Sequence, residues 1–173
     1  MRSTKIIVLD ALLSALASVV LCLGSLLGDL DLTFAAIASI SVFIALIEIG
    51  LSSAIAVWLV TSVVSAILCP SKFAVIMFAC FVGLYPIIKL VSEKFRPLIS
   101  WTIKILSVNI ATVTFTLLAR FVFFPEMREA WWIYALTLLL ANAATVMFDF
   151  VLSKFAVLYF LKLRKKLGFK DKK

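Results

Sequence analysis

The sequence predicts an all-α integral membrane protein, a bundle of six transmembrane helices with both termini in the cytoplasm. Composition is the first reason, because 65% of the 173 residues are apolar, only 15% are charged and the mean hydropathy is +1.21. Soluble domains have about 45 to 50% apolar and about 25% charged residues, which argues against a water-soluble fold. The second reason is that the apolar residues form runs long enough to cross a bilayer, separated by short polar segments.

The placement of the basic residues is the third reason. The formal net charge is +8, and seven of the seventeen basic residues lie in the last twelve positions, while most others flank apolar runs. Six spans put both chain ends on one side, where ends and loops hold twelve basic residues against two in the opposite loops. The positive-inside rule then predicts cytoplasmic termini in the cell membrane. The pattern fits membrane anchoring and does not predict a nucleic-acid partner.

The first span is expected over residues 5–28, because Gly28 and the carboxylates after it end the apolar run. This run is longer than the core of a signal peptide and contains Asp10, so we expect it in the mature protein. The next run, 32–69, would be about 57 Å long as one helix, roughly twice the bilayer core. It must therefore turn back near Glu48, Gly50 and Ser53, where the glycine ends one helix and the serine caps the next. The turn leaves spans at 32–48 and 51–69.

The later spans are separated by prolines and charged residues. The fourth is expected over 73–91, with a kink from Pro86 near one end. The fifth covers 98–124 and the sixth 130–161, and the sixth opens on aromatic residues suited to a membrane interface. Residues 162–173 form a basic cytoplasmic tail. We therefore predict a single transmembrane domain over 1–161.

The first span carries a stripe of small side chains. Ala11, Ala15, Ser18, Cys22 and Ser25 recur at steps of four, three, four and three residues, which places all five on one helical face. Burying apolar surface gives no net drive in lipid, so membrane helices associate where small residues let their backbones come close. The positions predicted to contact a partner membrane protein are Ala11, Ala15, Ser18 and Cys22.

The last two spans each carry a stripe with polar side chains. On the fifth span the stripe consists of Asn109, Thr112, Thr116 and Arg120. On the sixth, which runs in the opposite direction, it consists of Trp131, Asn142, Thr145 and Asp149. Stripes on consecutive antiparallel helices predict a polar seam between the two spans.

This seam has two interpretations. In the first it lines a solute pocket open to the outside, where Arg120 binds an anionic group and Trp131, Trp132 and Tyr134 offer flat apolar contacts. In the second the Asn and Thr side chains hydrogen-bond between helices at about 0.6 kcal/mol each. Arg120, only about 7 Å of rise from Pro125, then simply snorkels to the interface. The predicted substrate-binding set is Asn109, Thr112, Thr116, Arg120, Trp131, Tyr134 and Asn142.

Three acidic residues, Asp10, Glu48 and Asp149, are expected near the cytoplasmic ends of their spans. Four lysines lie at similar depth, and these are Lys5, Lys89, Lys104 and Lys154. Acids inside membranes serve as proton relays in some transporters, but near the ends of spans they more often pair with lysines. We therefore favour structural pairing.

Enzyme chemistry has little support in the sequence. The chain has no histidine, which removes the commonest general base and metal ligand, and it has no GxSxG motif and no phosphate-binding loop. Its three cysteines form no CxxC pair, so we interpret them as small core residues. We expect no catalytic residue, no metal site and no cofactor.

The chain resembles the substrate-binding S components of energy-coupling factor (ECF) transporters. The resemblance covers the whole chain as an architecture: six short helices, both ends inside, and an AxxxA motif in the first helix, here Ala11 to Ala15. In that family the motif faces a shared transmembrane T component and two cytoplasmic ATPases supply the energy. A small molecule, often a vitamin, binds near the outer face. The resemblance implies an uptake subunit for a vitamin-like solute, anionic if Arg120 binds it.

Two other functions remain open. A membrane scaffold similar to the small six-span cell-shape proteins of the MreD type would hold a partner through the same stripe and move no solute. A self-sufficient proton-coupled exporter would need an acid at mid-membrane, and none is expected there. An outer cavity lined by Asn109, Thr116, Arg120 and Asn142 would favour solute binding, whereas tight packing would favour a scaffold.

Overall fold

The computed structural model describes residues 4–28, 30–118, 131–159 and 161, and within them it contains helices and turns and no strand. The elements are α1 (Thr4–Leu27), α2 (Asp31–Glu48), α3 (Leu51–Leu68), α4 (Lys72–Met77), the π-helix η1 (Phe78–Val82), α5 (Tyr85–Ser92), α6 (Pro97–Leu118) and α7 (Trp131–Leu158). Because α4, η1 and α5 form one continuous span, these residues contain six segments long and apolar enough to cross a membrane.

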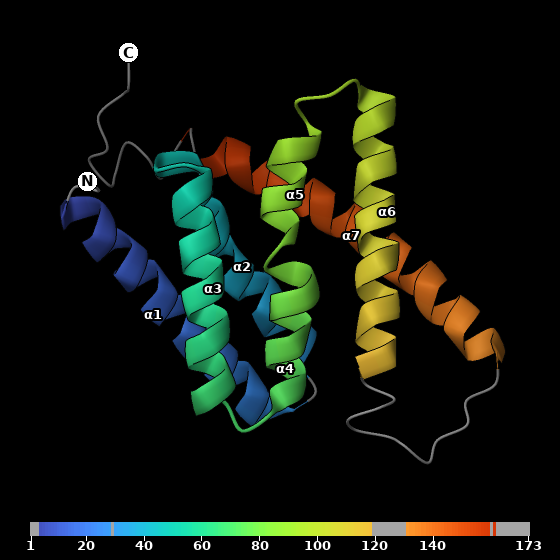
Figure 1. Cartoon of the computed structure of the whole chain (residues 1–173), viewed down its shortest axis with the longest axis horizontal. Helices are drawn as coiled ribbons and strands as arrows, with labels where there is room; N and C mark the ends of the chain where they lie inside the picture. The colour runs from blue at the N-terminus through green and yellow to red at the C-terminus, as the bar shows by residue number, and fades with distance from the viewer. Residues whose placement is uncertain (1–3, 29, 119–130, 160, 162–173) are drawn as a thin grey trace.

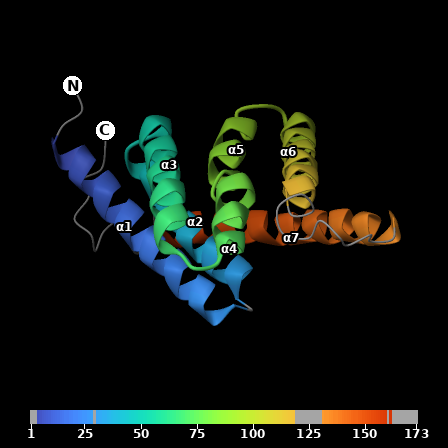
Figure 2. The same cartoon turned by 60° about the horizontal axis from the view of Figure 1, so that its bottom comes forward.

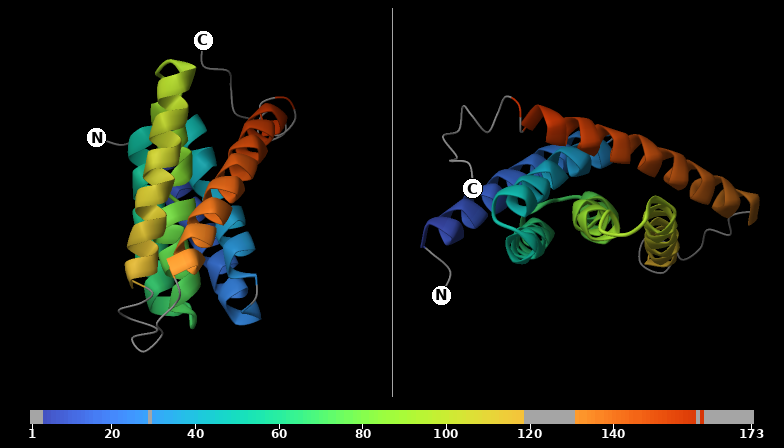
Figure 3. Two further views of the ribbon diagram at one scale, coloured as in Figure 1. Left: turned by 90° about the vertical axis from the view of Figure 1, so that its right-hand side faces the viewer. Right: turned by 90° about the horizontal axis from the view of Figure 1, so that it is seen from above.

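The helices form two layers. α3, the α4–η1–α5 span and α6 stand side by side in a row, which is seen end-on from above (Figure 3, right). α1, α2 and α7 lie behind this row and run at a slant to it (Figures 1 and 2). α1 packs against α2 and α3, whereas α7 packs chiefly against α6. The apolar core therefore lies mainly where the first three helices meet η1 and α5.

The expected all-helical class with six apolar spans is confirmed. The first four spans begin and end within one residue of the positions expected from the sequence. The fifth begins at Pro97, and the sixth runs as a helix from Trp131 to Leu158. The expected end of the fifth span at 124, the start of the sixth at 130 and the tail 162–173 lie outside the described residues.

The fourth span is interrupted where the sequence predicted a kink. Pro86 lies in the first turn of α5, and the ring of a helical proline clashes with the carbonyl four residues earlier, here that of Val82. Val82 is the last residue of η1, and the chain turns through Gly83 before α5 begins. The break therefore lies one turn before the proline that causes it.

One backbone hydrogen bond and one from a side chain make this break possible inside the bundle. The N–H of Gly83 donates to the carbonyl of Phe78 at 2.8 Å, and Trp58 Nε1–H of α3 donates to the carbonyl of Ala79 at 3.1 Å. A Cβ at Gly83 would lie 2.7 Å from the Phe78 carbonyl oxygen and 2.9 Å from Trp58 Cδ1. Unsatisfied backbone groups are costly in a membrane. The indole N–H of Trp58 therefore stabilises the break, because it supplies a donor to the carbonyl of Ala79.

Glycines also shape α1 and the turn between α2 and α3. Gly50 has φ 124 and ψ −176, a conformation open almost only to glycine, and it directly precedes α3. No side chain caps α3, and Ser53, the cap expected from the sequence, is buried within the helix. On α1, a Cβ at Gly24 would lie 2.4 Å from the Cβ of Phe34, which shows how closely α1 and α2 approach.

Candidate functional site

The small-residue stripe of α1 lies along the edge of the helix face that packs into the bundle. That face is centred on Ser14, Ala17 and Leu21, which are all buried. Ala11 and Ala15 are exposed. The chain's own helices therefore leave these two alanines open to contact from outside.

The remaining predicted partner positions point differently. Ser18 is buried, and its hydroxyl donates to the carbonyl of Ser14 at 2.9 Å, while Cys22 is half-buried. A partner that touches Ala11 and Ala15 would not reach Ser18 in this conformation. The spacing of the stripe along the helix does not tell which of its residues the chain's own helices cover.

The polar seam between α6 and α7 contains one direct hydrogen bond. Asn142 Nδ2–H donates to Asn109 Oδ1 at 2.8 Å, and the same amide donates to the carbonyl of Leu138 at 2.8 Å. Thr112 and Thr116 instead donate to carbonyls of α6 itself, at 2.9 and 2.7 Å. The two asparagines thus join the helices, and the threonines satisfy their hydroxyl protons locally.

Tyr134 is the other predicted substrate contact whose side chain the structure describes. Tyr134 is half-buried on α7. Arg120 and the side chain of Trp131 lie outside the described part of the chain.

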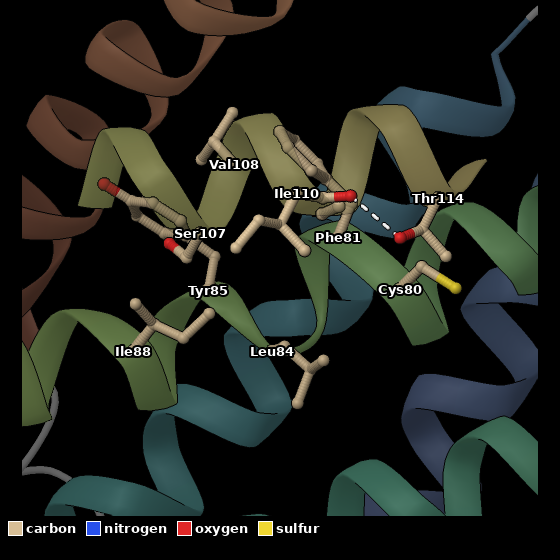
Figure 4. Close-up of a pocket in the computed structure, with 10 residues that line it drawn as sticks. Cys80, Phe81, Leu84, Tyr85, Ile88, Ser107, Val108, Ile110 and Thr114 are labelled. Atoms are coloured by element: carbon tan, nitrogen blue, oxygen red, sulfur yellow. Dashed lines mark hydrogen bonds between the residues drawn. The ribbon is translucent and has the colours of Figure 1, made fainter. Parts of the chain in front are cut away.

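Several pockets open between the described helices. The first, of about 370 Å³, lies between the η1–α5 segment and α6, and its walls are mainly Phe81, Leu84, Ile88 and Val108 (Figure 4). The second, of about 270 Å³, lies among α2, η1, α6 and α7 and includes Thr112. Neither is lined by Asn109, Thr116 or Asn142. These two pockets offer mainly apolar contact.

The third pocket, of about 480 Å³, lies between α2, α5 and α7 and has charged side chains in its wall. Phe43, Leu46 and Leu90 supply apolar surface, while Lys89 and Glu93 supply charge. Both charged residues belong to a cluster that also includes side chains of α6 and α7.

This charge cluster joins α5, α6 and α7 through Asp149. Its Oδ1 lies 2.7 Å from Lys89 Nζ and 3.0 Å from Lys104 Nζ, and it accepts a hydrogen bond from Tyr85 at 2.8 Å. Glu93 Oε1 lies 3.1 Å from Lys89 Nζ and 3.4 Å from Lys104 Nζ. Lys89 and Lys104 are only 5% and 4% exposed, so both ammonium groups depend on these partners.

The cluster balances its own charge. Two ammonium groups face two carboxylates, and Lys89 also donates to Ser153 Oγ at 2.7 Å. The preference for structural pairing is confirmed for Asp149, which meets two of the expected lysines. Glu48 accepts a hydrogen bond from Tyr159 at 3.1 Å.

Sequence reasoning missed Tyr85, Glu93 and Ser153 as members of this cluster. A signal was present for each of them, since Tyr85 precedes Lys89 by four residues, Glu93 follows Lys89 by four and Ser153 follows Asp149 by four, which places each pair on one helical face. This spacing did not show that Tyr85 would bond to Asp149 on another helix. Among the described residues, no group of three or more metal-binding side chains is present.

Neither a family model, nor a curated protein, nor a solved structure matches this chain. Its function must therefore be argued from the α1 face, the pockets and the charge cluster.

Proposed function

We propose that this chain is the solute-binding subunit of an ECF-type uptake transporter in the cell membrane, with cytoplasmic termini. The observation that carries the proposal is the exposure of Ala11 and Ala15 on the outside of the bundle. Small residues let the backbone of a neighbouring helix come close, which suits a helix that docks on a transmembrane T component. Cytoplasmic ATPases would then act through that partner.

The second pocket supports the solute-binding part of the proposal. It lies among helices that include α6 and α7, and it combines the apolar side chains of Phe81 and Phe115 with the hydroxyl-bearing Thr112 and Thr137. Apolar walls with a few polar groups are typical of small-molecule sites, although about 270 Å³ is near the lower limit of their size. A compact, vitamin-like solute suits this volume.

The docking part is tested by enlarging the exposed alanines. Ala11→Leu combined with Ala15→Leu should leave the protein in the membrane and abolish co-purification of its membrane partner, because the added side chains hold the two backbones apart. Ala143→Leu, at an exposed alanine on α7, is the matched control and should co-purify as the wild type does. Equal recovery of the partner with the double variant would refute docking through α1.

A non-transporting scaffold of the MreD type is the second candidate, and the Asn109–Asn142 hydrogen bond favours it. A direct hydrogen bond between two amides on neighbouring helices acts as a structural link. Mass spectrometry of small molecules released from the purified, denatured protein separates the candidates. A compound bound in stoichiometric amount supports the transporter subunit, whereas its repeated absence from preparations that retain the partner supports the scaffold.

A further inference from the structure

Two cysteines that are distant in the sequence meet at one end of the bundle. Cys22 lies in the last two turns of α1, and Cys69 directly follows α3, 47 positions later. Their Sγ atoms are 2.8 Å apart. Carbon atoms in ordinary contact are about 3.5 to 4.0 Å apart and the sulfurs of a disulfide about 2.05 Å. The two thiols are therefore already closer than an ordinary packing contact.

Their surroundings hold the two sulfurs in this position. Cys69 is 1% exposed, and its N–H donates to the carbonyl of Ser65 at 2.9 Å, which fixes the end of α3. Cys22 is half-buried, and the hydroxyl of Ser25 donates to its carbonyl at 2.9 Å. A reagent can thus reach Cys22 first, whereas Cys69 is accessible mainly to the sulfur beside it.

We propose that Cys22 and Cys69 are a dithiol pair that closes to a disulfide between α1 and α3 when a small disulfide compound acts as oxidant. The Cys22 thiolate attacks one sulfur of the oxidant, forms a mixed disulfide and releases one thiol. Cys69 then loses its proton, attacks the Cys22 sulfur and displaces the second thiol. The two cysteines lose two protons and two electrons, and the oxidant is reduced to two thiols.

The position of Cys22 and Cys69 determines which part of the bundle a disulfide between them would constrain. The pair lies near the C-terminal end of α1, about two turns beyond Ala15 and about three beyond Ala11, and close in sequence to the chain turn before α4. With cytoplasmic termini this end faces outward, where disulfides persist more readily than in the cytosol. Closure would tie the last turns of α1 to α3 and leave the turns that carry Ala11 and Ala15 unconstrained.

The test uses the full-length protein, reduced and then freed of reductant, in detergent micelles with the lipid-permeant oxidant 2,2′-dithiodipyridine. The pair should release two pyridinethiones for each reagent molecule consumed, with no reagent left on either cysteine. Peptide mass spectrometry without reduction should find the peptides of Cys22 and Cys69 joined, lighter by two hydrogen atoms than the separate thiols. Cys80 should retain one pyridyl group, which makes it an internal reference.

Single serine variants provide the controls. Cys22→Ser and Cys69→Ser should each lose the joined peptide, and the remaining cysteine of the pair should either retain a pyridyl group or stay unreacted. Cys80→Ser should form the joined peptide as the wild type does. A wild-type protein in which both Cys22 and Cys69 retain pyridyl groups, or in which the joined peptides come from two different chains, would overturn the proposal.

Discussion

Asp149 accepts hydrogen bonds from three side chains on two other helices, namely Tyr85 and Lys89 of α5 and Lys104 of α6. A buried ion pair is weak evidence of net stability, because desolvation of the charges opposes their attraction. Loss of one member has a larger effect, since the remaining charges stay buried without compensation. The role of this residue is therefore to permit two lysines inside the bundle.

The first prediction concerns this carboxylate. Asp149→Asn keeps the side-chain volume but leaves Glu93 as the one carboxylate that faces Lys89 and Lys104 in the described structure, and breaking a buried pair costs about 3 to 5 kcal/mol. We expect a loss of this order, somewhat reduced by the partial exposure of Glu93, in the free energy of unfolding in mixed micelles. Lys154→Met is the control, because this exposed lysine contacts only the Phe150 ring in the described structure, at 5.2 Å. Equal stability of Asp149→Asn and wild type would exclude a structural role.

The second prediction concerns the reactivity of Cys69. Burial, followed by the contact with Cys22, raises the pKa of the Cys69 thiol to about 11, compared with 9.0 for an ordinary thiol. Only the thiolate reacts with iodoacetamide. Between pH 9 and 10 the thiolate fraction of a group with pKa near 11 rises about ninefold, whereas that of an ordinary thiol rises about twofold.

Alkylation of Cys69 in the reduced protein should therefore accelerate about ninefold over this pH interval, as followed by peptide mass spectrometry. The same cysteine in the denatured chain serves as the control and should accelerate about twofold. A twofold rise in the folded protein as well would show that burial does not suppress the thiolate.

At the scale of the elements, helix ends were predictable because single residues determine them. Gly28, Gly50 and Pro70 end apolar runs, and the observed helices α1, α2 and α3 end one or two residues before them. The interruption of the fourth span was only partly predictable. Pro86 identified the span that bends, but the sequence did not show that Trp58 of α3, the preceding span, would donate to the carbonyl of Ala79 and stabilise the break.

The third prediction tests that break. Gly83→Ala would place a methyl group 2.7 Å from the Phe78 carbonyl oxygen and 2.9 Å from Trp58 Cδ1, so the chain must shift. Overpacking of this kind destabilises by about 1 to 3 kcal/mol, and here it also disturbs the indole hydrogen bond to Ala79.

We expect a lower free energy of unfolding for Gly83→Ala and a smaller loss for Trp58→Phe, which removes the indole donor. Ala143→Gly, at an exposed helical position, is the control for a change of backbone freedom, and it should lower the free energy of unfolding by about 1 kcal/mol. A Gly83→Ala variant as stable as the wild type would show that η1 adapts to the added methyl group.

At the scale of the whole molecule, the sequence predicted which residues share a helix face but not which faces meet. Asn109 and Asn142 were placed on one seam, and the structure joins them. Asp149 was placed in the same stripe, yet its carboxylate meets lysines of α5 and α6 together. The slant of α7 across the other helices decides this, and it results from packing that no periodicity in a single helix encodes.

The fourth prediction follows from this uneven packing. α1, α2 and α3 pack against one another, whereas α7 is the least buried span and meets mainly α6. Segments with few buried contacts open at lower free energy than the core, so amides of 131–144 should exchange hydrogen faster in nanodiscs than those of α1 and α2.

Asn142→Leu should accelerate exchange in α6 and α7 further, because the link to Asn109 contributes about 0.6 kcal/mol, and it should leave α1 and α2 unchanged. Mass spectrometry after timed exchange measures both effects. Uniform exchange along all six spans would contradict this division. If the purified protein carries a solute in the pocket beside Thr112, removing that solute should accelerate exchange in the same two helices, since the solute then contacts both of them.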